Sequence, residues 1–354
     1  HRNLIINGGM TICQRVAGNT LTAIPSNAVH VVDRWKTWES TDGTYQAKQN
    51  YVTDLVGFTT SLYLSPNSAD TNIAAGQYAL VGQNIEAQNL QHIGVGTANA
   101  KTLTLSFYIK HNLTAPSGTK TMNAYLAKYD NGTMVVPLEF NLPSSVDTWE
   151  RITLSVPALT SGGVINDDNG LGFEVIWALT VGSTFKTGTS GTWGSSGNAL
   201  STSNHNINFM GSTSNYIELT GVQLELGSVA TPFEHRSYGE ELTRCHRYFQ
   251  SFASAHETDQ MGWMGMSYGA NSCYMPVTFY QPMRAQPDCL SAGTWSTRAQ
   301  NDQTFTADFN YQRAGRYGCV LTQANTSLPT QSANTAFWVE IQNNNCQLQF
   351  EAEL

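Results

Sequence analysis

The stretch that decides the fold is Tyr216–Phe249, which reads YIELTGVQLELGSVATPFEHRSYGEELTRCHRYF. Apolar and polar residues alternate over residues 217–226, with an interruption at Gly221. A period of two is typical of a half-buried strand, and a glycine inside a strand marks a bulge or a close backbone approach. The pattern therefore predicts a bulged closing strand whose acidic residues, Glu218 and Glu225, face outward.

A short amphipathic helix is expected next. Ser237-Tyr-Gly-Glu240 matches the serine-to-glutamate capping box of a helix start, and apolar residues follow at spacings of three and four. We expect a helical junction over residues 237–250, in which Ser237 and Glu240 form the cap. The residues expected to point inward are Leu242, Cys245 and Phe249, and those expected to point outward are Glu241 and Arg244.

The residues before this junction predict an all-β domain. Short stretches of period two recur up to residue 226, and Thr102–Lys110 is the clearest of them. Many short antiparallel strands separated by turn signals, such as Asn131-Gly132, favour a jelly-roll-like β-sandwich over residues 1–236. Other strand candidates include Leu4–Cys13, Val31–Trp38 and Ile207–Met210.

Residues 251–354 predict a second, smaller β-sandwich domain, and a chain of 354 residues is long enough for two cores. Gly265-Met-Ser-Tyr-Gly269 has the formal pattern of a nucleophile elbow. That chemistry needs a strand-to-helix turn and later triad partners, whereas His256 and Asp259 precede the serine. A glycine-rich β segment is the better interpretation.

Composition argues against several partners and compartments. The formal net charge is −8, so neither nucleic acid nor an anionic membrane is an expected partner. The longest apolar runs are too short for membrane insertion, and no signal peptide is recognisable. Six cysteines without a CxxC pair predict reduced, mostly buried thiols.

Candidate glycan-binding residues are aromatic or amide side chains, because a flat ring stacks on the apolar face of a sugar. Trp38 is one candidate, and Trp193 is another, since it lies in a long loop rich in glycine, serine and threonine. Asn204 ends that loop and could add an amide. Packing under a loop is the alternative for each tryptophan, and Trp35 is assigned to the core.

The acidic turn Asn166-Asp-Asp-Asn-Gly170 is a candidate calcium site, with Asp167 and Asp168 as ligands. The spacing of an EF-hand is absent, so a solvated turn is the alternative. No other cofactor is indicated, because phosphate-loop and dinucleotide motifs are missing and the histidines lack metal spacing. We expect no enzymatic activity, although paired carboxylates for glycoside cleavage are recognised only in three dimensions.

The run GVQLELGSVATPFEHRSYGEELTRCHRYF, the opening NLIINGGMTICQR and Asp33-Arg-Trp35 together resemble a family of bacteriophage and prophage tail-fibre or virion-surface proteins. Residues Gln281–Cys289 (QPMRAQPDC) are similar to that family too. The resemblance implies a carbohydrate-binding-module-like β-sandwich followed by a small β domain.

On that resemblance the function is host attachment: an adhesin that binds host cell-surface polysaccharide non-covalently. The alternative is a structural virion protein, decorating the capsid as a head fibre or connecting tail parts. The implied partners are host glycans, other virion proteins and the chain itself as a homotrimer. The implied location is the virion, after synthesis in the host cytoplasm.

Overall fold

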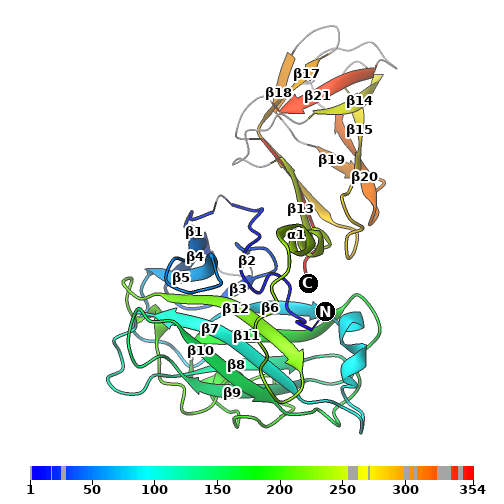
Figure 1. Cartoon of the computed structure of the whole chain (residues 1–354). Coiled ribbons are helices and arrows are strands. Elements are labelled where there is room, and N and C mark those ends of the chain that lie inside the picture. Colours follow the sequence, from blue (N-terminus) through cyan, green and yellow to red (C-terminus); the bar gives the residue numbers. More distant parts are fainter. Residues whose placement is uncertain are drawn as a thin grey trace. The chain divides into compact units, whose positions relative to one another are not determined.

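The computed structural model describes residues 2–16, 18–24, 29–253, 262–269, 272–298, 303–306, 309–324, 336–341 and 346–354 (Figure 1). The chain divides into two compact units. Unit 1 comprises residues 1–13, 18–238 and 354, and unit 2 comprises residues 14–17 and 239–353. In the described residues both units are built almost wholly of strands, which confirms the all-β class.

Unit 1 is a sandwich of two six-stranded antiparallel sheets in its described residues (Figure 1). Sheet A has the order β1-β4-β5-β12-β7-β10, and sheet B has the order β2-β3-β6-β11-β8-β9. The strands of sheet A are β1 Thr22–Ile24, β4 Thr44–Tyr51, β5 Thr60–Ser68, β12 Ile217–Leu226, β7 Leu103–His111 and β10 Glu150–Val156. Those of sheet B are β2 Val29–His30, β3 Lys36–Glu39, β6 Tyr78–Glu86, β11 Leu171–Val181, β8 Thr121–Lys128 and β9 Met134–Asn141. Three short 3-10 helices, η1 Ala87–Ile93, η2 Ser183–Phe185 and η3 Phe209–Gly211, lie between strands.

The core between the two sheets is rich in aromatic residues. Trp177 of β11 packs its ring against Phe107 of β7, with ring centroids 5.1 Å apart. Trp35 is buried beside Trp177 and donates its indole N–H to the carbonyl of Asn7, as expected for a core residue. These contacts tie sheet A to sheet B by burial of large apolar area.

Strand β12 lies between β5 and β7 and contains the predicted bulge. The register with β7 shifts between Thr220 and Gln223, and Gly221 has a φ of 61°. A Cβ at Gly221 would lie 2.7 Å from Phe58 Cζ, so the position requires glycine for space as well as for backbone conformation. Glu218 and Glu225 lie on the outer face of sheet A as predicted, since Leu219 and Leu224 beside them are in the core, but both are buried there rather than exposed.

The N-terminal segment explains part of that burial. The predicted strand Leu4–Cys13 is wrong: the segment is irregular, with positive φ at Asn7 and Met10. Pairing of β12 with β5 ends at Leu219, and the segment then satisfies the free backbone edge of β12. The N–H of Leu4 donates to Leu224 and the N–H of Val222 donates to Gly8, each at 2.9 Å.

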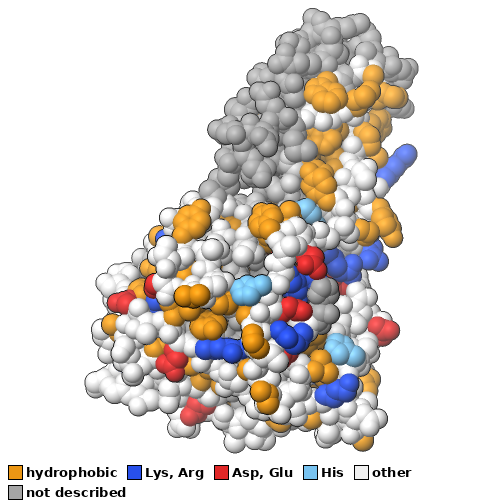
Figure 2. Space-filling view, in the orientation of Figure 1, with side chains coloured by type: hydrophobic (Ala, Val, Ile, Leu, Met, Phe, Trp, Pro, Cys, Tyr) orange, Lys and Arg blue, Asp and Glu red, His pale blue; other side chains and the backbone are white. Residues whose placement is uncertain are grey.

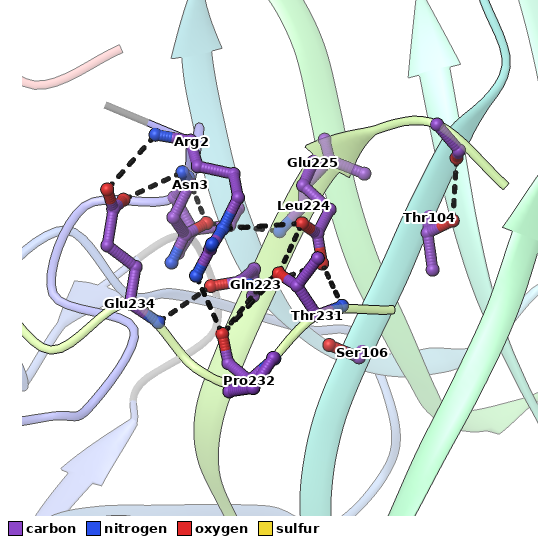
Figure 3. Close-up of polar contacts among 12 residues, drawn as sticks. Arg2, Asn3, Thr104, Ser106, Gln223, Leu224, Glu225, Thr231, Pro232 and Glu234 are labelled. Carbon is purple, nitrogen blue, oxygen red and sulfur yellow. Dashed lines mark hydrogen bonds and ion pairs between the residues drawn. The ribbon is translucent and has the colours of Figure 1, made fainter. Parts of the chain in front are cut away.

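Polar side chains fix this segment to the end of β12 (Figure 3). The Glu234 carboxylate accepts the backbone N–H groups of Arg2 and Asn3 at 3.1 and 2.8 Å. The Asn3 side chain accepts the N–H of Leu224 at 3.1 Å. The Glu225 carboxylate accepts the N–H and hydroxyl of Thr231 at 2.9 and 2.6 Å and lies 3.5 Å from Arg2 Nε.

These contacts predict an acid-sensitive stabilisation. Burial raises the pKa of Glu225, but hydrogen bonds from Thr231 and Gln223 and the charge of Arg2 outweigh it and hold the pKa below its usual value. The carboxylate therefore stabilises the fold above about pH 4.5, and the stabilisation is lost as the pH falls through the lowered pKa. We expect Glu225→Gln to lower the free energy of unfolding by about 1–2 kcal/mol at pH 7. Urea denaturation should show the difference shrinking in acid; a constant difference down to pH 2 would contradict the prediction.

A long arm over residues 184–204 covers the outer face of sheet B. Its Gly194 exchanges two backbone hydrogen bonds of 2.8 Å with Val135 of β9. Arm residues Phe185 and Leu200 pack on a second apolar cluster formed mainly by sheet B. The buried members of this cluster are Leu80, Tyr125, Ala127, Val135, Ile176, Ala178, Val181 and Leu200. The arm therefore packs on unit 1 and covers the outer face of sheet B, not the outer face of sheet A.

Two further strand predictions in unit 1 are wrong. Residues 207–210 form η3 and its approach, not a strand. Residues 31–38 contain a turn between β2 and β3, in which Arg34 has a φ of 72°. In both places the buried apolar residues belong to segments without regular secondary structure. The alternation of apolar and polar residues alone therefore predicts the wrong backbone conformation.

Unit 2 contains a three-stranded and a seven-stranded sheet in its described residues. The smaller has the order β13-β22-β16, and the larger has the order β18-β17-β21-β14-β15-β20-β19. Their bounds are β13 Phe249–Ala253, β14 Gly262–Gly269, β15 Ser272–Thr278, β16 Asp288–Ala292, β17 Thr294–Arg298, β18 Gln303–Thr306, β19 Asn310–Gln312, β20 Gly318–Ala324, β21 Ala336–Ile341 and β22 Gln347–Glu351. Gly265–Gly269 lies inside β14 with Ser267 buried, which confirms the glycine-rich β segment; His256 and Asp259 lie outside the described residues.

Residues 14–17 belong to unit 2 although they lie near the start of the chain. The guanidinium of Arg15 is 3.2 Å from Glu351 and 2.9 Å from Glu353, and its carbon lies 3.8 Å from the centroid of the Phe249 ring. Two ion pairs and a cation–π contact thus hold this segment in unit 2.

The helix α1 spans Tyr238–His246, directly after Ser237 and with Glu240 in its first turn. Cys245 is buried as expected and Leu242 is half-buried. Phe249 is also buried as expected, but it belongs to β13, where it pairs with Glu351, and not to the helix. The predicted outward position of Glu241 is wrong, because this residue is buried. The reason is the helix phase, since residues 241 and 245 share a face at a spacing of four and the helix ends before residue 249. Capping by Ser237 stays a prediction.

Candidate functional site

The outer face of sheet A carries a row of polar and aromatic side chains from four neighbouring strands. Strand register places Lys48 of β4 opposite Tyr63 of β5, Tyr63 opposite Glu218 of β12, and Glu218 opposite Lys110 of β7. Residues directly opposite in a sheet share a face. Their neighbours along the strands, Ala47, Leu64, Ile217 and Ile109, are fully buried in the core. The row therefore points away from the core.

The rings of Tyr63, Tyr216 and Trp149 lie beside the lysines of this row. Tyr63 and Tyr216 stack with centroids 5.3 Å apart and an interplanar angle of 22°. The ammonium of Lys48 lies 5.1 Å from the Tyr63 centroid, and that of Lys110 lies 4.8 Å from the Trp149 centroid. All three rings are half-buried. We call the set of Lys48, Tyr63, Lys110, Trp149, Tyr216 and Glu218 the aromatic platform.

Hydrogen bonds and ion pairs fix the charged members of the platform. Lys110 Nζ lies 3.2 Å from Asp54 Oδ2 and 3.3 Å from Glu218 Oε1. The other oxygen of Glu218 accepts the hydroxyl of Ser61 at 2.5 Å and the amide of Asn50 at 3.2 Å. Side chains held in this way do not have to be ordered when a ligand binds, which reduces the entropic cost of binding.

The same contacts fix the orientation of two rings. The indole N–H of Trp149 donates to Asp54 Oδ1 at 2.9 Å, and the hydroxyl of Tyr216 donates to the Asp147 carboxylate. Burial raises the pKa of Tyr63 and, together with Asp147, that of Tyr216, so both phenols stay neutral in ordinary buffers. Figure 2 shows hydrophobic side chains interspersed with charged ones on the face of unit 1 that carries β12 and β7.

Asp54, one of the two carboxylates beside Lys110, lacks the property that the general acid of a glycosidase needs. A general acid needs a raised pKa, so that it is protonated at working pH. Burial raises the pKa of Asp54, but hydrogen bonds from Trp149 and Lys110 outweigh it and lower the pKa. Asp54 is therefore an ionised acceptor. The arrangement favours ligand binding over acid catalysis.

Comparisons with known proteins gave only distant structural neighbours. No family model matches the chain, and no curated protein matches it. A solved α-L-arabinofuranosidase, MgGH51, has 9% identity and a TM-score of 0.34, over 64% of this chain and 26% of that chain. The CBM22-1-CBM22-2 tandem domain of Xyn10C from Paenibacillus barcinonensis has 8% identity and a TM-score of 0.30, over 96% and 98%. Discoidin II from Dictyostelium discoideum has 7% identity and a TM-score of 0.20, over 94% and 100%. The candidate site therefore rests on the geometry of sheet A alone.

The tryptophans predicted as glycan platforms lie on the side of sheet B. Trp38 of β3 is half-buried against the cluster under the arm, with Lys36 Nζ 5.1 Å from its ring centroid. Trp193 of the arm stacks on buried Phe173 at 6.3 Å and donates its indole N–H to Pro157. Strands β3 and β9 are four positions apart in sheet B, roughly 19 Å. The structure thus gives packing contacts to both rings and does not join them into one site.

The third predicted glycan-binding residue, Asn204, is exposed at the end of the arm. Its amide donates to both carboxylate oxygens of Glu139 at 3.3 and 3.1 Å. Thr202 donates its hydroxyl to the same carboxylate at 2.5 Å. Asn204 therefore helps to attach the arm to β9, and sheet B separates it from the aromatic platform.

The predicted calcium ligands, Asp167 and Asp168, are exposed. One oxygen of Asp168 accepts the N–H of Gly170 at 2.8 Å, as in an ordinary turn. Within the described residues no group of three or more histidine, cysteine or acidic side chains is placed to hold a metal ion. Calcium binding at this turn stays a prediction.

Proposed function

We propose that unit 1 binds glycans of a host cell surface non-covalently through the aromatic platform. The observation that carries the proposal is the set of three rings, Tyr63, Tyr216 and Trp149, held on an outer sheet face that the arm does not cover. Stacking of a ring on a sugar contributes on the order of 1 kcal/mol by analogy with aromatic pairs. A few such contacts with polar partners correspond to affinities in the millimolar range.

The resemblance of residues 221–249 and of the N-terminal stretch supports a virion setting for this activity. We propose that the chain is part of a virion-surface fibre, assembled with other virion proteins and with further copies of itself, as in a homotrimer. Multiple copies convert weak single sites into firm attachment. Within the described residues no helix has the length and apolar character needed to span a membrane.

The proposed activity is binding without cleavage, because Asp54 is ionised and Lys110 lies between the platform carboxylates. Incubation of the full chain with polysaccharide from the host envelope should release no reducing ends. Release of reducing ends would show a glycoside hydrolase instead. Absence of any retention on host cells would favour the structural virion role.

Substitutions in the platform test the site. We expect Tyr63→Ala and Trp149→Ala each to weaken retention on host polysaccharide by about tenfold, because each removes one stacking surface worth about 1.4 kcal/mol or less. Affinity electrophoresis in gels containing the polysaccharide measures the change.

Matched controls come from aromatic residues outside the platform. Tyr129→Ala removes an exposed tyrosine of unit 1, and Trp38→Ala removes the half-buried tryptophan on the side of sheet B. Both variants should keep the retention of the wild-type chain. Equal retention of Tyr63→Ala, Trp149→Ala and the controls would refute the platform as the binding site.

A further inference from the structure

A second group of rings lies beside the aromatic platform, and its first member is Tyr108 of β7. This side chain points away from the core of unit 1, because its neighbours Phe107 and Ile109 are fully buried there. Register places Tyr108 opposite Thr220 of β12. On β7 it is two residues from Lys110 of the platform, which is roughly 7 Å along the strand. Tyr108 therefore continues the platform on the same outer face of sheet A.

Three further rings pack beside Tyr108. Phe58, in the loop between β4 and β5, has its ring centroid 5.2 Å from that of Tyr108. The Phe58 centroid is also 5.2 Å from that of Phe233 and 5.3 Å from that of His235, both in the segment that follows β12. The rings of Phe58, Tyr108 and Phe233 are half-buried, like those of the platform, and His235 is exposed. We call the set of Phe58, Tyr108, Phe233 and His235 the aromatic extension.

The bulge at Gly221 lets these rings approach the sheet closely. A Cβ at this position would lie 2.7 Å from Phe58 Cζ and 2.9 Å from Tyr108 Cδ2, so the glycine leaves the space that both rings occupy. The loop that carries Phe58 also carries Asp54, which accepts the indole N–H of Trp149 at 2.9 Å. One loop therefore positions a ring of the extension and a ring of the platform.

The segment that follows β12 is held on sheet A by hydrogen bonds from both neighbouring elements. The guanidinium of Arg151 in β10 donates to the backbone carbonyl of Thr231. The backbone N–H of Glu234 donates to the side-chain carbonyl of Gln223 in β12 at 2.9 Å. The two rings of this segment are therefore held in place before any ligand arrives, which reduces the entropic cost of binding.

The platform and the extension together cover more of sheet A than one sugar ring does. Tyr63 and Tyr108 lie two strand positions and two residues apart, which is roughly 12 Å. A continuous row of partly exposed rings among polar side chains is typical of a ligand-binding surface. We propose that the binding site continues over the extension and takes a linear stretch of several sugars inside a polysaccharide, rather than one terminal sugar. This inference rests on the proposed glycan binding of unit 1.

The experiment measures the affinity of the full chain for oligosaccharides of graded length, prepared from host-envelope polysaccharide by partial acid hydrolysis. Wild-type affinity should rise with length until the oligosaccharide reaches both sets of rings, because each further ring adds a stacking contact. Phe58→Leu keeps an apolar side chain beside Gly221, and His235→Ala removes an exposed ring. Each variant should weaken binding of the longest oligosaccharides by about three- to tenfold and that of the shortest by less than about twofold.

Matched controls come from the same residue types elsewhere in unit 1. Phe185 is half-buried against the cluster on the side of sheet B, and His92 is exposed in η1. Phe185→Leu and His92→Ala should bind every length as the wild-type chain does. A measurement on the wild-type chain removes the dependence on variant folding: amide hydrogen exchange of residues 57–59 and 233–235 should slow with the longest oligosaccharides and not with the shortest.

The dependence on length separates a ligand contact from a structural role. Equal weakening at all lengths would show that the rings of the extension only support the fold, and unchanged affinity of Phe58→Leu and His235→Ala at all lengths would show that they do not contact the glycan. Either result would overturn the extension, while weakened binding of Tyr63→Ala would still support the platform. If the wild-type chain binds no oligosaccharide of any length, the proposed function itself fails and the extension fails with it.

Discussion

Replacement of Lys128 by methionine should lower the free energy of unfolding of unit 1 by about 3 kcal/mol. Lys128 ends β8, and its side chain is fully buried. Its ammonium donates to the carbonyl oxygens of Gly132 at 3.0 Å and Gly162 at 2.9 Å, and also to that of Asp130. Methionine keeps much of the volume but donates no hydrogen bond, so three carbonyls lose a charged donor. Each such bond contributes about 1.5–3 kcal/mol, offset in part because no ammonium has to be desolvated.

Equilibrium urea denaturation followed by tryptophan fluorescence measures the effect. Lys101→Met is the control, because Lys101 is exposed and its loss should change stability by less than about 0.5 kcal/mol. Equal stability of the Lys128 and Lys101 variants would show that the three-carbonyl contact contributes nothing. Since Gly162 lies outside the β8–β9 hairpin, hydrogen exchange around residues 157–163 should also increase in Lys128→Met.

Lowering the pH from 7 to 5 should cost unit 1 about 2 kcal/mol through one buried histidine. Burial of His205, with a smaller effect of the Lys186 ammonium, lowers its pKa to about 3. Below pH 6.5 the unfolded chain binds a proton at this residue, whereas the folded chain does not until about pH 3. Above pH 6.5 the titration of His205 therefore hardly changes the free energy of unfolding. Between pH 6.5 and about pH 3 it lowers that free energy progressively. Glu225 acts only at lower pH, so the two effects separate.

His205→Phe removes the titrating group and keeps a ring of similar size. Its loss of stability between pH 7 and pH 5 should be smaller than that of the wild-type chain by about 2 kcal/mol, whatever its stability at pH 7. His92→Phe, at an exposed position, should keep the pH dependence of the wild-type chain. If His205→Phe loses stability in acid as steeply as the wild type, the prediction is wrong.

Much of the fold could be predicted because the alternation of apolar and polar residues indicates which side of a strand faces the core. Thr102–Lys110 and the bulged strand around Gly221 are examples, since each has one apolar side in the core. Leu4–Cys13 could not be predicted, because its buried residues lie on irregular backbone that completes the edge of β12. Alternation places Glu218 on the outer face correctly, but it does not reveal that the side chain is buried, because the burial depends on Ser61, Asn50 and Lys110 from other strands.

The candidate site was less predictable than the fold. Tyr63 stands at an outward position of an ordinary alternating strand pattern, between Leu62 and Leu64. Trp149 follows a loop and has no motif around it. Both gain significance only from strand register and from Lys110, which lies far away in sequence. In the sequence, Trp193 indicates a sugar contact only because it is an aromatic residue in a polar loop. Only the packing of that loop on sheet B reveals its ring as a structural contact.

Because residues 14–17 belong to unit 2, the ribosome makes the two parts of that unit at widely separated times. Arg15 is made early, yet its partners Phe249, Glu351 and Glu353 emerge more than 230 residues later. At 5–20 residues per second, the segment waits roughly 10–70 s for them on the ribosome. A fragment starting at Gly239 would lack Arg15, and with it the ion pairs to Glu351 and Glu353 and the contact with Phe249. Unit 2 is thus completed only after Glu353 has been made, and only in a chain that still carries residues 14–17.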